Sequence, residues 1–165
     1  MEQLNDAYLD IETTGLSNFY DYITIIGIYN CKSEDSELIQ LVGSQITRDN
    51  LSMALENINT IYTYNGCRFD IPFINRYLKV NLGIKYCHHD LMYDCWQNNL
   101  YGGFKAVERK LGIYREIQDV DGFEATVLWQ KYKEFGDKES LRILLKYNEE
   151  DVVNLRALRR CLSEL

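Results

Sequence analysis

The sequence predicts a single α/β domain with a mixed β-sheet of about five strands, flanking α-helices and a helical C-terminal third. Three observations support this fold class. Strand-like segments come early in the chain, helical segments are interleaved with them, and helical periodicity dominates from residue 104 onward. With 165 residues, 46% hydrophobic and 13% aromatic, the chain can bury a core and fits one domain, residues 1–165.

The first expected strand covers residues 7–12. Its residues alternate in polarity, so the apolar side chains share one face, whereas Tyr8, Asp10 and Glu12 share the other. A strand of this kind packs its apolar face on a core. Its opposite face then presents both carboxylates to one site.

Periodicity and turn residues indicate the remaining elements. Further strands are expected at residues 23–29, 37–42, 60–64 and 86–91. Helices are expected at residues 49–57, 70–78, 104–111 and 122–135, and from residue 138 to the C-terminus. The helix that begins at Asp70 has an acid at its start and Pro72 in its first turn, which are both helix-opening signals.

The last helix has an apolar stripe at helical spacing that includes Leu141, Leu144, Leu145, Val152, Leu155, Leu158 and Leu162. Asn148 and Asp151 stand at the steps where this stripe should continue. A carboxylate that faces the body of a protein is costly unless it is paired or bound to a metal. Tyr147, one turn before Asp151, projects from the same side.

The chain therefore offers four candidate acids, Asp10, Glu12, Asp70 and Asp151, with Tyr147 four residues before the last. Carboxylates gathered in one cleft repel one another, so they need a cation. Oxygen-rich clusters select Mg²⁺ or Mn²⁺ over zinc. Two such ions roughly 3.5–4 Å apart can activate a water and stabilise the leaving oxygen of a phosphodiester. The sequence thus predicts a nuclease that uses two divalent cations, Mg²⁺ or Mn²⁺.

Each of these residues has a simpler interpretation when it is taken alone. Asp10 and Glu12 could be solvent-exposed residues of a sheet edge, and Asp70 could be a helix N-cap. Tyr147 could be a packing residue, and Asp151 a charge on a helix face. Their joint occurrence, with each acid at the end of a strand or on an inward helix stripe, favours the functional interpretation.

The net charge of −7, from 18 basic and 25 acidic residues, differs from the basic footprint that is usual in nucleic-acid-binding proteins. Two divalent cations would add four positive charges at the site. We therefore expect substrate binding that is weak or assisted by a partner protein. Lys105, Arg109 and Lys110 recur in one expected helix, where they form either a solvated face or phosphate contacts.

The N-terminal residues 1–7 contain two acids and no basic residue, so they are not expected to be a signal peptide. No apolar run approaches the roughly 20 residues of a membrane span. The expected location is the cytoplasm, with no membrane partner.

The five cysteines are odd in number and include no CxxC pair, which argues against a disulfide framework or a zinc ribbon. Cys87, His88, His89 and Cys95 could be read as a zinc cluster. Neighbouring residues of a strand point to opposite faces, however, so His88 and His89 could not share one ion.

Three motifs resemble those of the DEDD superfamily of 3′–5′ exonucleases. They are Asp10-Ile11-Glu12-Thr13 with Thr14-Gly15-Leu16, then Asn65-x-x-x-Phe69-Asp70, and then Tyr147-x-x-x-Asp151. The tyrosine is typical of the subclass of DNA-polymerase proofreading domains. The whole chain is more similar to stand-alone ribonuclease-H-like exonucleases of bacteria and archaea, many of which have histidine at the position of Tyr147. The resemblance implies one ribonuclease-H-like exonuclease domain, with central parallel strands and an antiparallel hairpin.

The resemblance also implies a role for each acid. Asp10 would bridge both metals, and Glu12 and Asp151 would complete the tighter site. Asp70 would hold the second ion mainly through water. Tyr147 would orient the attacking water, because its hydroxyl is a hydrogen-bonding group rather than a strong base at neutral pH.

Four further residues are implied as substrate contacts. Thr13 follows the first acids, and Leu16 would wedge against the terminal base. Asn65 and Phe69 would contact the last nucleotide. The implied partner is a nucleic acid with a free 3′ end, single-stranded or frayed, and the implied products are 5′-mononucleotides.

Two other functions remain open at this point. A ribonuclease-H-type endonuclease shares the fold, although the tyrosine of the third motif argues against it. A catalytically weak nucleic-acid-binding module is the second alternative, which the four intact acids disfavour. The sequence does not separate DNA from RNA, because recognition of a 2′-hydroxyl can take a single hydrogen bond.

Overall fold

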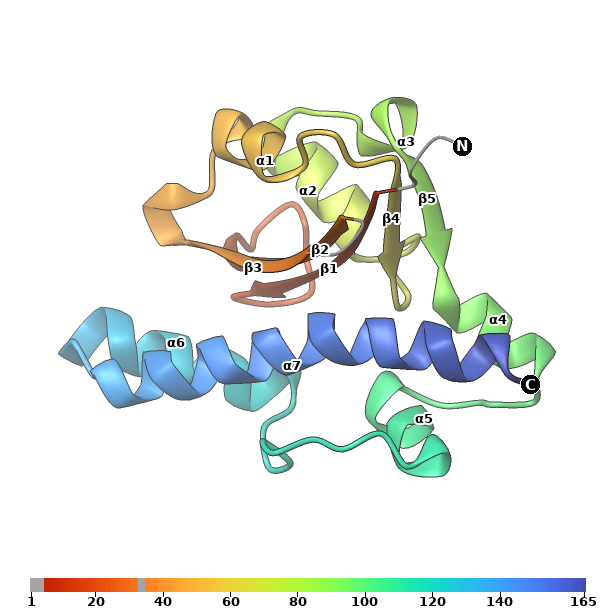
Figure 1. Ribbon diagram of the computed structural model, residues 1–165. Coiled ribbons are helices and arrows are strands. Elements are labelled where there is room, and N and C mark those ends of the chain that lie inside the picture. Colours follow the sequence, from red (N-terminus) through yellow and green to blue (C-terminus); the bar gives the residue numbers. More distant parts are fainter. Residues whose placement is uncertain (1–4, 33–34) are drawn as a thin grey trace.

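The computed structural model describes residues 5–32 and 35–165. Its centre is a five-stranded mixed sheet in the order β3-β2-β1-β4-β5 (Figure 1). The strands are β1 (Asp6–Thr13), β2 (Ile23–Lys32), β3 (Asp35–Val42), β4 (Thr60–Thr63) and β5 (Cys87–Asp90). Strands β1, β2 and β3 form an antiparallel meander, whereas β4 pairs parallel to both β1 and β5.

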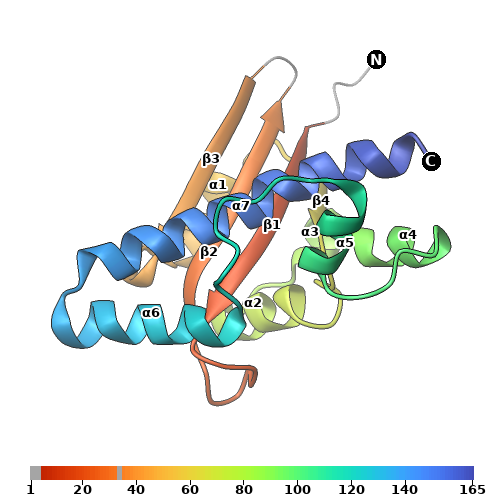
Figure 2. The ribbon, with the colours of Figure 1, turned by 90° about the horizontal axis from the view of Figure 1, so that it is seen from below.

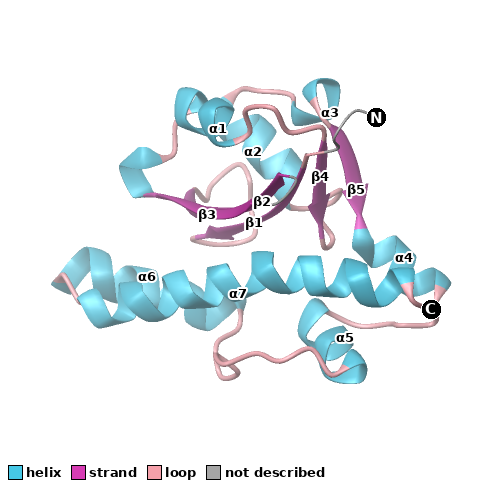
Figure 3. Ribbon diagram, in the orientation of Figure 1, coloured by secondary structure: helices cyan, strands magenta, loops and turns pink. Residues whose placement is uncertain are grey.

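Helices cover both faces of this sheet (Figures 1 and 3). Their bounds are α1 (Arg48–Ala54), α2 (Asp70–Leu78), α3 (Leu82–Lys85), α4 (Leu91–Gln97), α5 (Phe104–Leu111), α6 (Gly122–Phe135) and α7 (Lys138–Ser163), with a 3₁₀ turn η1 (Gly43–Gln45). Helices α1 and α2 lie over one face, and the long helix α7 crosses the other (Figure 2). Helix α6 runs beside the first half of α7, and α5 lies on the outer side of α7.

Strand β1 separates two hydrophobic regions, as its alternating sequence predicts. Ala7, Leu9 and Ile11 are buried in the core beneath α1 and α2. Tyr8 lies on the opposite face, in a core with apolar residues of α7 such as Val152. The acids of β1 therefore face α7, which brings them to the same layer as the acid of that helix.

The predicted fold class is confirmed: the mixed sheet has five strands, helices flank it, and α6 and α7 form a helical C-terminal part. The helices α3 and α4 were not predicted, and Leu91, expected at the end of the last strand, instead begins α4. The Asp90 side chain accepts a hydrogen bond from the Met92 amide (3.1 Å) and so caps α4. A helix of only two turns offers too few periodic positions to be recognised in a sequence.

Residues 1–4, which belong to the segment that was not expected to be a signal peptide, lie outside the described residues. Within residues 5–32 and 35–165, no helix combines the length and the apolar character that a membrane crossing requires.

Candidate active site

Three carboxylates meet where α7 crosses β1. Asp10 and Glu12 come from β1, and Asp151 comes from the middle of α7. One oxygen from each of the three side chains lies within 4.8 Å of the others. Residues that are far apart in the sequence thus form one acidic cluster, and a divalent cation could be held between them.

Asn148 fixes how closely α7 approaches the sheet. Its Nδ2 lies 3.4 Å from both the backbone oxygen and the carboxylate Oδ2 of Asp10. Its Oδ1 accepts a hydrogen bond from Gln40 Nε2 at 3.0 Å. A Cβ atom at Gly27 would lie 2.2 Å from Asn148 Oδ1, so only glycine leaves room for this side chain. This contact holds α7 close to β1 and β2 one turn before Asp151.

Asp70 reaches the same cluster from the first turn of α2. Its Oδ1 accepts a hydrogen bond from the backbone amide of Ile11 at 3.0 Å, between the two acids of β1. The simpler interpretation of Asp70 as a helix N-cap is wrong, because Phe69 occupies the cap position. Asp70 is not one of the three acids within 4.8 Å of one another, so it stands at the margin of the cluster.

Burial and mutual repulsion make the cluster hard to ionise. Burial, followed by the charges of neighbouring acids, raises the pKa values of Asp10 and Glu12 well above their usual range. Burial raises the pKa of Asp70 to about 7, and that of Asp151 to about 6 against the opposing effect of Arg115. The buried Oε1 of Glu12 also has no hydrogen-bond partner within the part of the chain that the structure describes. An unpaired oxygen in an acid cluster with raised pKa values fits a site for a cation.

Tyr147 lies one turn before Asp151 on α7 and is buried. Burial, and then the charge of Asp151, raises the pKa of its hydroxyl above the ordinary value of a phenol. The Lys105 ammonium lies 4.6 Å from the centroid of the Tyr147 ring. At neutral pH the Tyr147 hydroxyl is therefore protonated, and it can donate or accept a hydrogen bond but cannot act as a strong base.

A cleft of about 640 Å³ opens beside the acids. It is lined by all nine site residues that the sequence predicted: Asp10, Glu12, Thr13, Leu16, Asn65, Phe69, Asp70, Tyr147 and Asp151. Leu16 on the loop after β1 is 87% exposed, so an apolar side chain projects into solvent at the cleft. The structure thus brings the predicted residues together; their individual roles remain proposals.

Phe123 was missed by the sequence interpretation. It lines the same cleft from the first turn of α6 and is 73% exposed. The signal for the start of α6 was present, because Asp121 caps the helix with Glu124 in the reciprocal position. The sequence does not reveal, however, that this turn borders the acids of β1.

A second lobe of about 430 Å³ continues from the acids along α5. It shares Asp10, Tyr64, Gly122, Tyr147 and Asp151 with the first lobe. Lys105 and Arg109 line it, so two of the three basic residues noted in this helix face the site. Lys110 instead donates a hydrogen bond to the backbone oxygen of Tyr101 (2.7 Å).

Arg115 and Glu108 are further residues that the sequence interpretation missed. Arg115 donates from Nη2 to Asp151 Oδ1 (2.5 Å) and to Glu108 Oε1 (2.7 Å). Both Arg115 and Glu108 are buried. Arg115 lies in an irregular segment between α5 and α6, where no periodicity indicates which side chains face inward.

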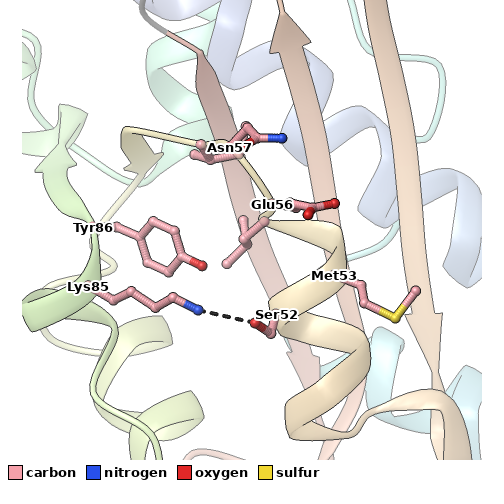
Figure 4. Close-up of a pocket in the computed structure, with 8 residues that line it drawn as sticks. Ser52, Met53, Glu56, Asn57, Lys85 and Tyr86 are labelled. Atoms are coloured by element: carbon pink, nitrogen blue, oxygen red, sulfur yellow. Dashed lines mark hydrogen bonds between the residues drawn. The ribbon is translucent and has the colours of Figure 1, made fainter.

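A separate pocket of about 380 Å³ lies beside α1 (Figure 4). Lys85 Nζ donates to Ser52 Oγ across it (3.1 Å), and Tyr86 forms part of its wall. Glu56 is the sole acid among its lining residues, all of which are described. This pocket has no carboxylate cluster and is not a candidate for the same chemistry.

The two histidines have different partners. His88 Nε2 lies 2.8 Å from Thr63 Oγ1, whereas His89 Nε2 lies 2.5 Å from Asp94 Oδ2. This separation agrees with the expectation that neighbouring strand residues could not share one metal ion.

Comparison with known proteins extends these observations. Residues 7–163 match the profile of the RNase_H superfamily. No curated protein sequence is significantly similar to the chain.

Among solved structures, the family B DNA polymerase from the hyperthermophilic archaeon Pyrobaculum calidifontis is similar with a TM-score of 0.75 and 17% identity. The match covers 97% of this chain but only 24% of the polymerase chain. Brucella melitensis NrnC with bound Mg²⁺ gives a TM-score of 0.65 at 18% identity, with 98% of this chain and 73% of NrnC covered. NrnC bound to pGG gives a TM-score of 0.64 at 20% identity, over 98% of this chain and 73% of that chain. At these identities, the similarity shows a shared fold.

Proposed function

Because this chain belongs to the RNase_H superfamily, we propose that its acidic cleft is the active site of a metal-dependent 3′–5′ exonuclease. The enzyme would hydrolyse phosphodiester bonds at the 3′ end of a nucleic acid and release 5′-mononucleotides. The observation that carries the proposal is the meeting of Asp10, Glu12 and Asp151, with one oxygen of each within 4.8 Å, beside Tyr147 and Asp70.

The four acids are the proposed metal ligands. Asp10, Glu12 and Asp151 would hold one divalent cation, and Asp70 would contribute to a second near the margin of the cluster. Bound Mg²⁺ or Mn²⁺ would polarise the scissile phosphate and lower the pKa of an attacking water. The raised carboxyl pKa values and the unpaired Oε1 of Glu12 support this assignment, because a cation would relieve both.

Tyr147 is the proposed water-orienting residue. Its protonated hydroxyl can accept or donate one hydrogen bond but does not compete with the carboxylates for the metal. This role agrees with the tyrosine subclass of DEDD exonucleases, to which the third motif is similar. The Asn148 contact keeps α7 at a fixed height over the sheet, so Tyr147 and Asp151 hold a constant position relative to Asp10.

The two lobes suggest how a strand would lie in the site. Leu16, Phe69 and Phe123 line the first lobe with apolar surface, which suits the stacking of a terminal base. Thr13 and Asn65 add polar groups to this lobe. It would hold the 3′-terminal nucleotide.

Lys105 and Arg109 give the second lobe the positive charge that a phosphate backbone requires. The preceding nucleotides would follow this lobe along α5, with the scissile phosphate between the lobes at the acids. The overall charge of −7 opposes the binding of a polyanion, so a partner protein that delivers the strand is part of the proposal.

The test is hydrolysis of 5′-labelled DNA and RNA oligonucleotides, single-stranded and frayed duplex, with Mg²⁺ or Mn²⁺. We expect a ladder that shortens by single nucleotides from the 3′ end, and strong inhibition by a 3′-phosphate. pGG, which is bound to NrnC in one solved structure, serves as a short test substrate. Internal cuts in a circular single strand would contradict exonuclease action.

The same experiment separates the alternatives. A ribonuclease-H-type endonuclease would cut the RNA strand of an RNA–DNA hybrid whose ends are blocked. A binding module with a weak site would retain labelled oligonucleotide without shortening it, and Asp10→Asn would not change its affinity in EDTA.

A further inference from the structure

Arg115 is the cation nearest to the acid cluster in the described part of the chain. Its guanidinium makes a two-pronged contact with Glu108, through Nε to Oε2 (2.9 Å) and Nη2 to Oε1 (2.7 Å). Nη2 also donates to Oδ1 of Asp151 (2.5 Å). Arg115 is only 5% exposed, so these charges interact with little screening by water.

Helix α7 holds the Arg115 segment in place with residues that flank Asp151. The Glu150 carboxylate accepts hydrogen bonds from the backbone amides of Glu116 (2.5 Å) and Ile117 (2.9 Å). Asn154 Nδ2 donates to the backbone oxygen of Tyr114 (3.0 Å) and to Glu108 Oε1 (2.9 Å). The residues just before and after Arg115 are thus fixed to the turns of α7 that carry Asp151.

Arg115 approaches Asp151 from outside the two lobes of the cleft. Arg115 lines neither of the two lobes, although Asp151 lines both. Its Nη1 is buried and has no hydrogen-bond partner among residues 5–32 and 35–165. The other two nitrogens, Nε and Nη2, donate to the carboxylates of Glu108 and Asp151, so the guanidinium links Asp151 to a second buried acid.

The chain contains a second Arg–Glu pair with the same geometry. Arg142 Nε and Nη2 donate to Glu139 at 2.9 Å and 2.7 Å, the same distances as in the Arg115–Glu108 pair. Both residues are exposed, and they lie in the first two turns of α7, before Tyr147 and Asp151. This surface pair is a matched control for the buried one.

We propose that Arg115 is a positioning residue of the metal site, which holds one oxygen of Asp151 and sets the affinity of the cluster for divalent cations. A carboxylate has two oxygens, so Asp151 can be held by Arg115 through one and still offer the other to a metal. The fixed positive charge also reduces repulsion among the acids when no metal is bound, and it weakens the binding of a metal that carries charge of the same sign. This assignment rests on the proposed metal-dependent function.

Removal of Arg115 should have two effects of opposite direction. Without the arginine charge, the cluster is more negative, and the concentration of Mn²⁺ at half-saturation should fall by about tenfold. Without the contact to Oδ1, Asp151 is free to rotate, and turnover at saturating Mn²⁺ should fall by about 10–100-fold. A group that only maintains the fold would not tighten metal binding while slowing the reaction.

The experiment is a Mn²⁺ titration of thermal unfolding, paired with turnover at saturating Mn²⁺, on wild type, Arg115→Gln and Arg115→Lys. Arg115→Lys keeps the positive charge but loses the planar guanidinium that makes several hydrogen bonds at once. Its Mn²⁺ midpoint should therefore stay near wild type, and its turnover should be higher than that of Arg115→Gln. Arg142→Gln should match wild type in both measurements. Since Arg115→Gln leaves Glu108 buried without its charged partner, the double variant with Glu108→Gln provides a neutral pair if the single variant does not fold.

An unchanged or higher Mn²⁺ midpoint in folded Arg115→Gln would overturn the assignment. Wild-type turnover in Arg115→Gln, or in the double variant if the single variant does not fold, would also overturn it. The binding measurement needs no catalysis, so it separates this proposal from the proposed function. Wild-type protein that binds Mn²⁺ but hydrolyses no oligonucleotide would refute the nuclease proposal, and the midpoint of Arg115→Gln would still decide the effect of Arg115 on metal affinity.

Discussion

The face of β1 that lies against α7 carries acids at both ends, and α7 meets them in opposite ways. At one end, Asp6 Oδ2 accepts a hydrogen bond from Arg159 Nη1 (2.5 Å). The same nitrogen donates to the Tyr8 hydroxyl (3.1 Å), and the guanidinium lies 4.0 Å from the centroid of the Tyr62 ring. At the other end, Asp10 and Glu12 meet Asp151, a third acid.

The two ends of this strand face can thus be compared directly. At one end the charges are balanced within the chain, which we call the complete end, and at the other, incomplete end they are not. The Asp6 end has matched charges within the chain. The Asp10 end has a surplus of negative charge, raised carboxyl pKa values and a buried Glu12 oxygen that has no partner among the described residues. A fold tolerates such a surplus only at some loss of stability, and a cation from solution is the simplest group that would complete it. The incomplete end is therefore the one that we propose as the active site.

The same substitution at the two ends should have the most different consequences for activity. Asp10→Asn removes a proposed metal ligand, and metal activation contributes several kcal/mol to phosphodiester hydrolysis, so the rate should fall about 10³-fold or more. Asp6→Asn should leave turnover at the wild-type value. Single-turnover rates on a labelled oligonucleotide measure both.

Metal binding should report the same contrast without catalysis. Mn²⁺ should raise the melting temperature of wild type and of Asp6→Asn, since a ligand that binds only the native state stabilises it. Asp10→Asn should blunt this rise. A rise that an ionic-strength control reproduces in full would contradict the metal site.

Tyr147→Phe tests whether α7 contributes more than a ligand to the incomplete end. The change keeps the ring and removes the hydroxyl that would orient water, so turnover should fall about 10²-fold, the lower end for loss of such a group. The Mn²⁺ midpoint should not change, because all four carboxylates remain. If Tyr147 is only a packing residue, turnover will stay near wild type and the effect will appear in the melting temperature.

In EDTA, the acid cluster should make the stability of the metal-free protein depend on pH. In the folded metal-free protein the pKa of Asp151 is raised to about 6 and that of Asp70 to about 7, from 3.8 in the unfolded chain. The folded state then binds more protons than the unfolded state between about pH 4 and pH 7, so stability should fall as pH rises through this window and level off above it. Urea unfolding at pH 5, 6, 7 and 8 measures this loss, which we expect to be a few kcal/mol.

Saturating Mn²⁺ should reduce the fall of stability with pH, because the metal offsets the negative charge that the carboxylates gain at high pH. Asp70→Asn should also reduce it. A metal-free protein whose stability rises between pH 5 and pH 8 would contradict the assignment of raised pKa values to the cluster.

Local sequence patterns were sufficient to predict the positions of three acids of the cluster. The alternation in residues 7–12 placed Asp10 and Glu12 on one face, and helical periodicity placed Asp151 on the buried side of the last helix. Both inferences depend only on neighbours in sequence. They succeed because β1 and α7 are long, regular elements.

The contacts that complete the site depend on how separate elements pack. Arg115 reaches Asp151 because Glu150 and Asn154 fix an irregular segment against α7, and no local pattern encodes that contact. Asp70 was correctly placed at the start of a helix, but its bond to the Ile11 amide requires the position of β1. Likewise, Lys105 faces the site because of how α5 is oriented on the rest of the fold. This helix has only two turns, so periodicity is a weak guide to which of its residues face inward.

The complete end of the β1 face should yield the smallest effect, and one confined to stability. Arg159→Gln removes the charge that pairs with Asp6 and stacks on Tyr62, but the Arg159 side chain is 38% exposed and its ion pair is partly screened by water. We expect a loss of about 1 kcal/mol in the free energy of unfolding, equal with and without Mn²⁺, and turnover at the wild-type level. Urea unfolding in the presence of Mn²⁺ and, separately, of EDTA measures this free energy. A Mn²⁺-dependent loss of stability, or a change in turnover, would mean that the two ends of this strand face are coupled through α7 and that the comparison between them does not hold.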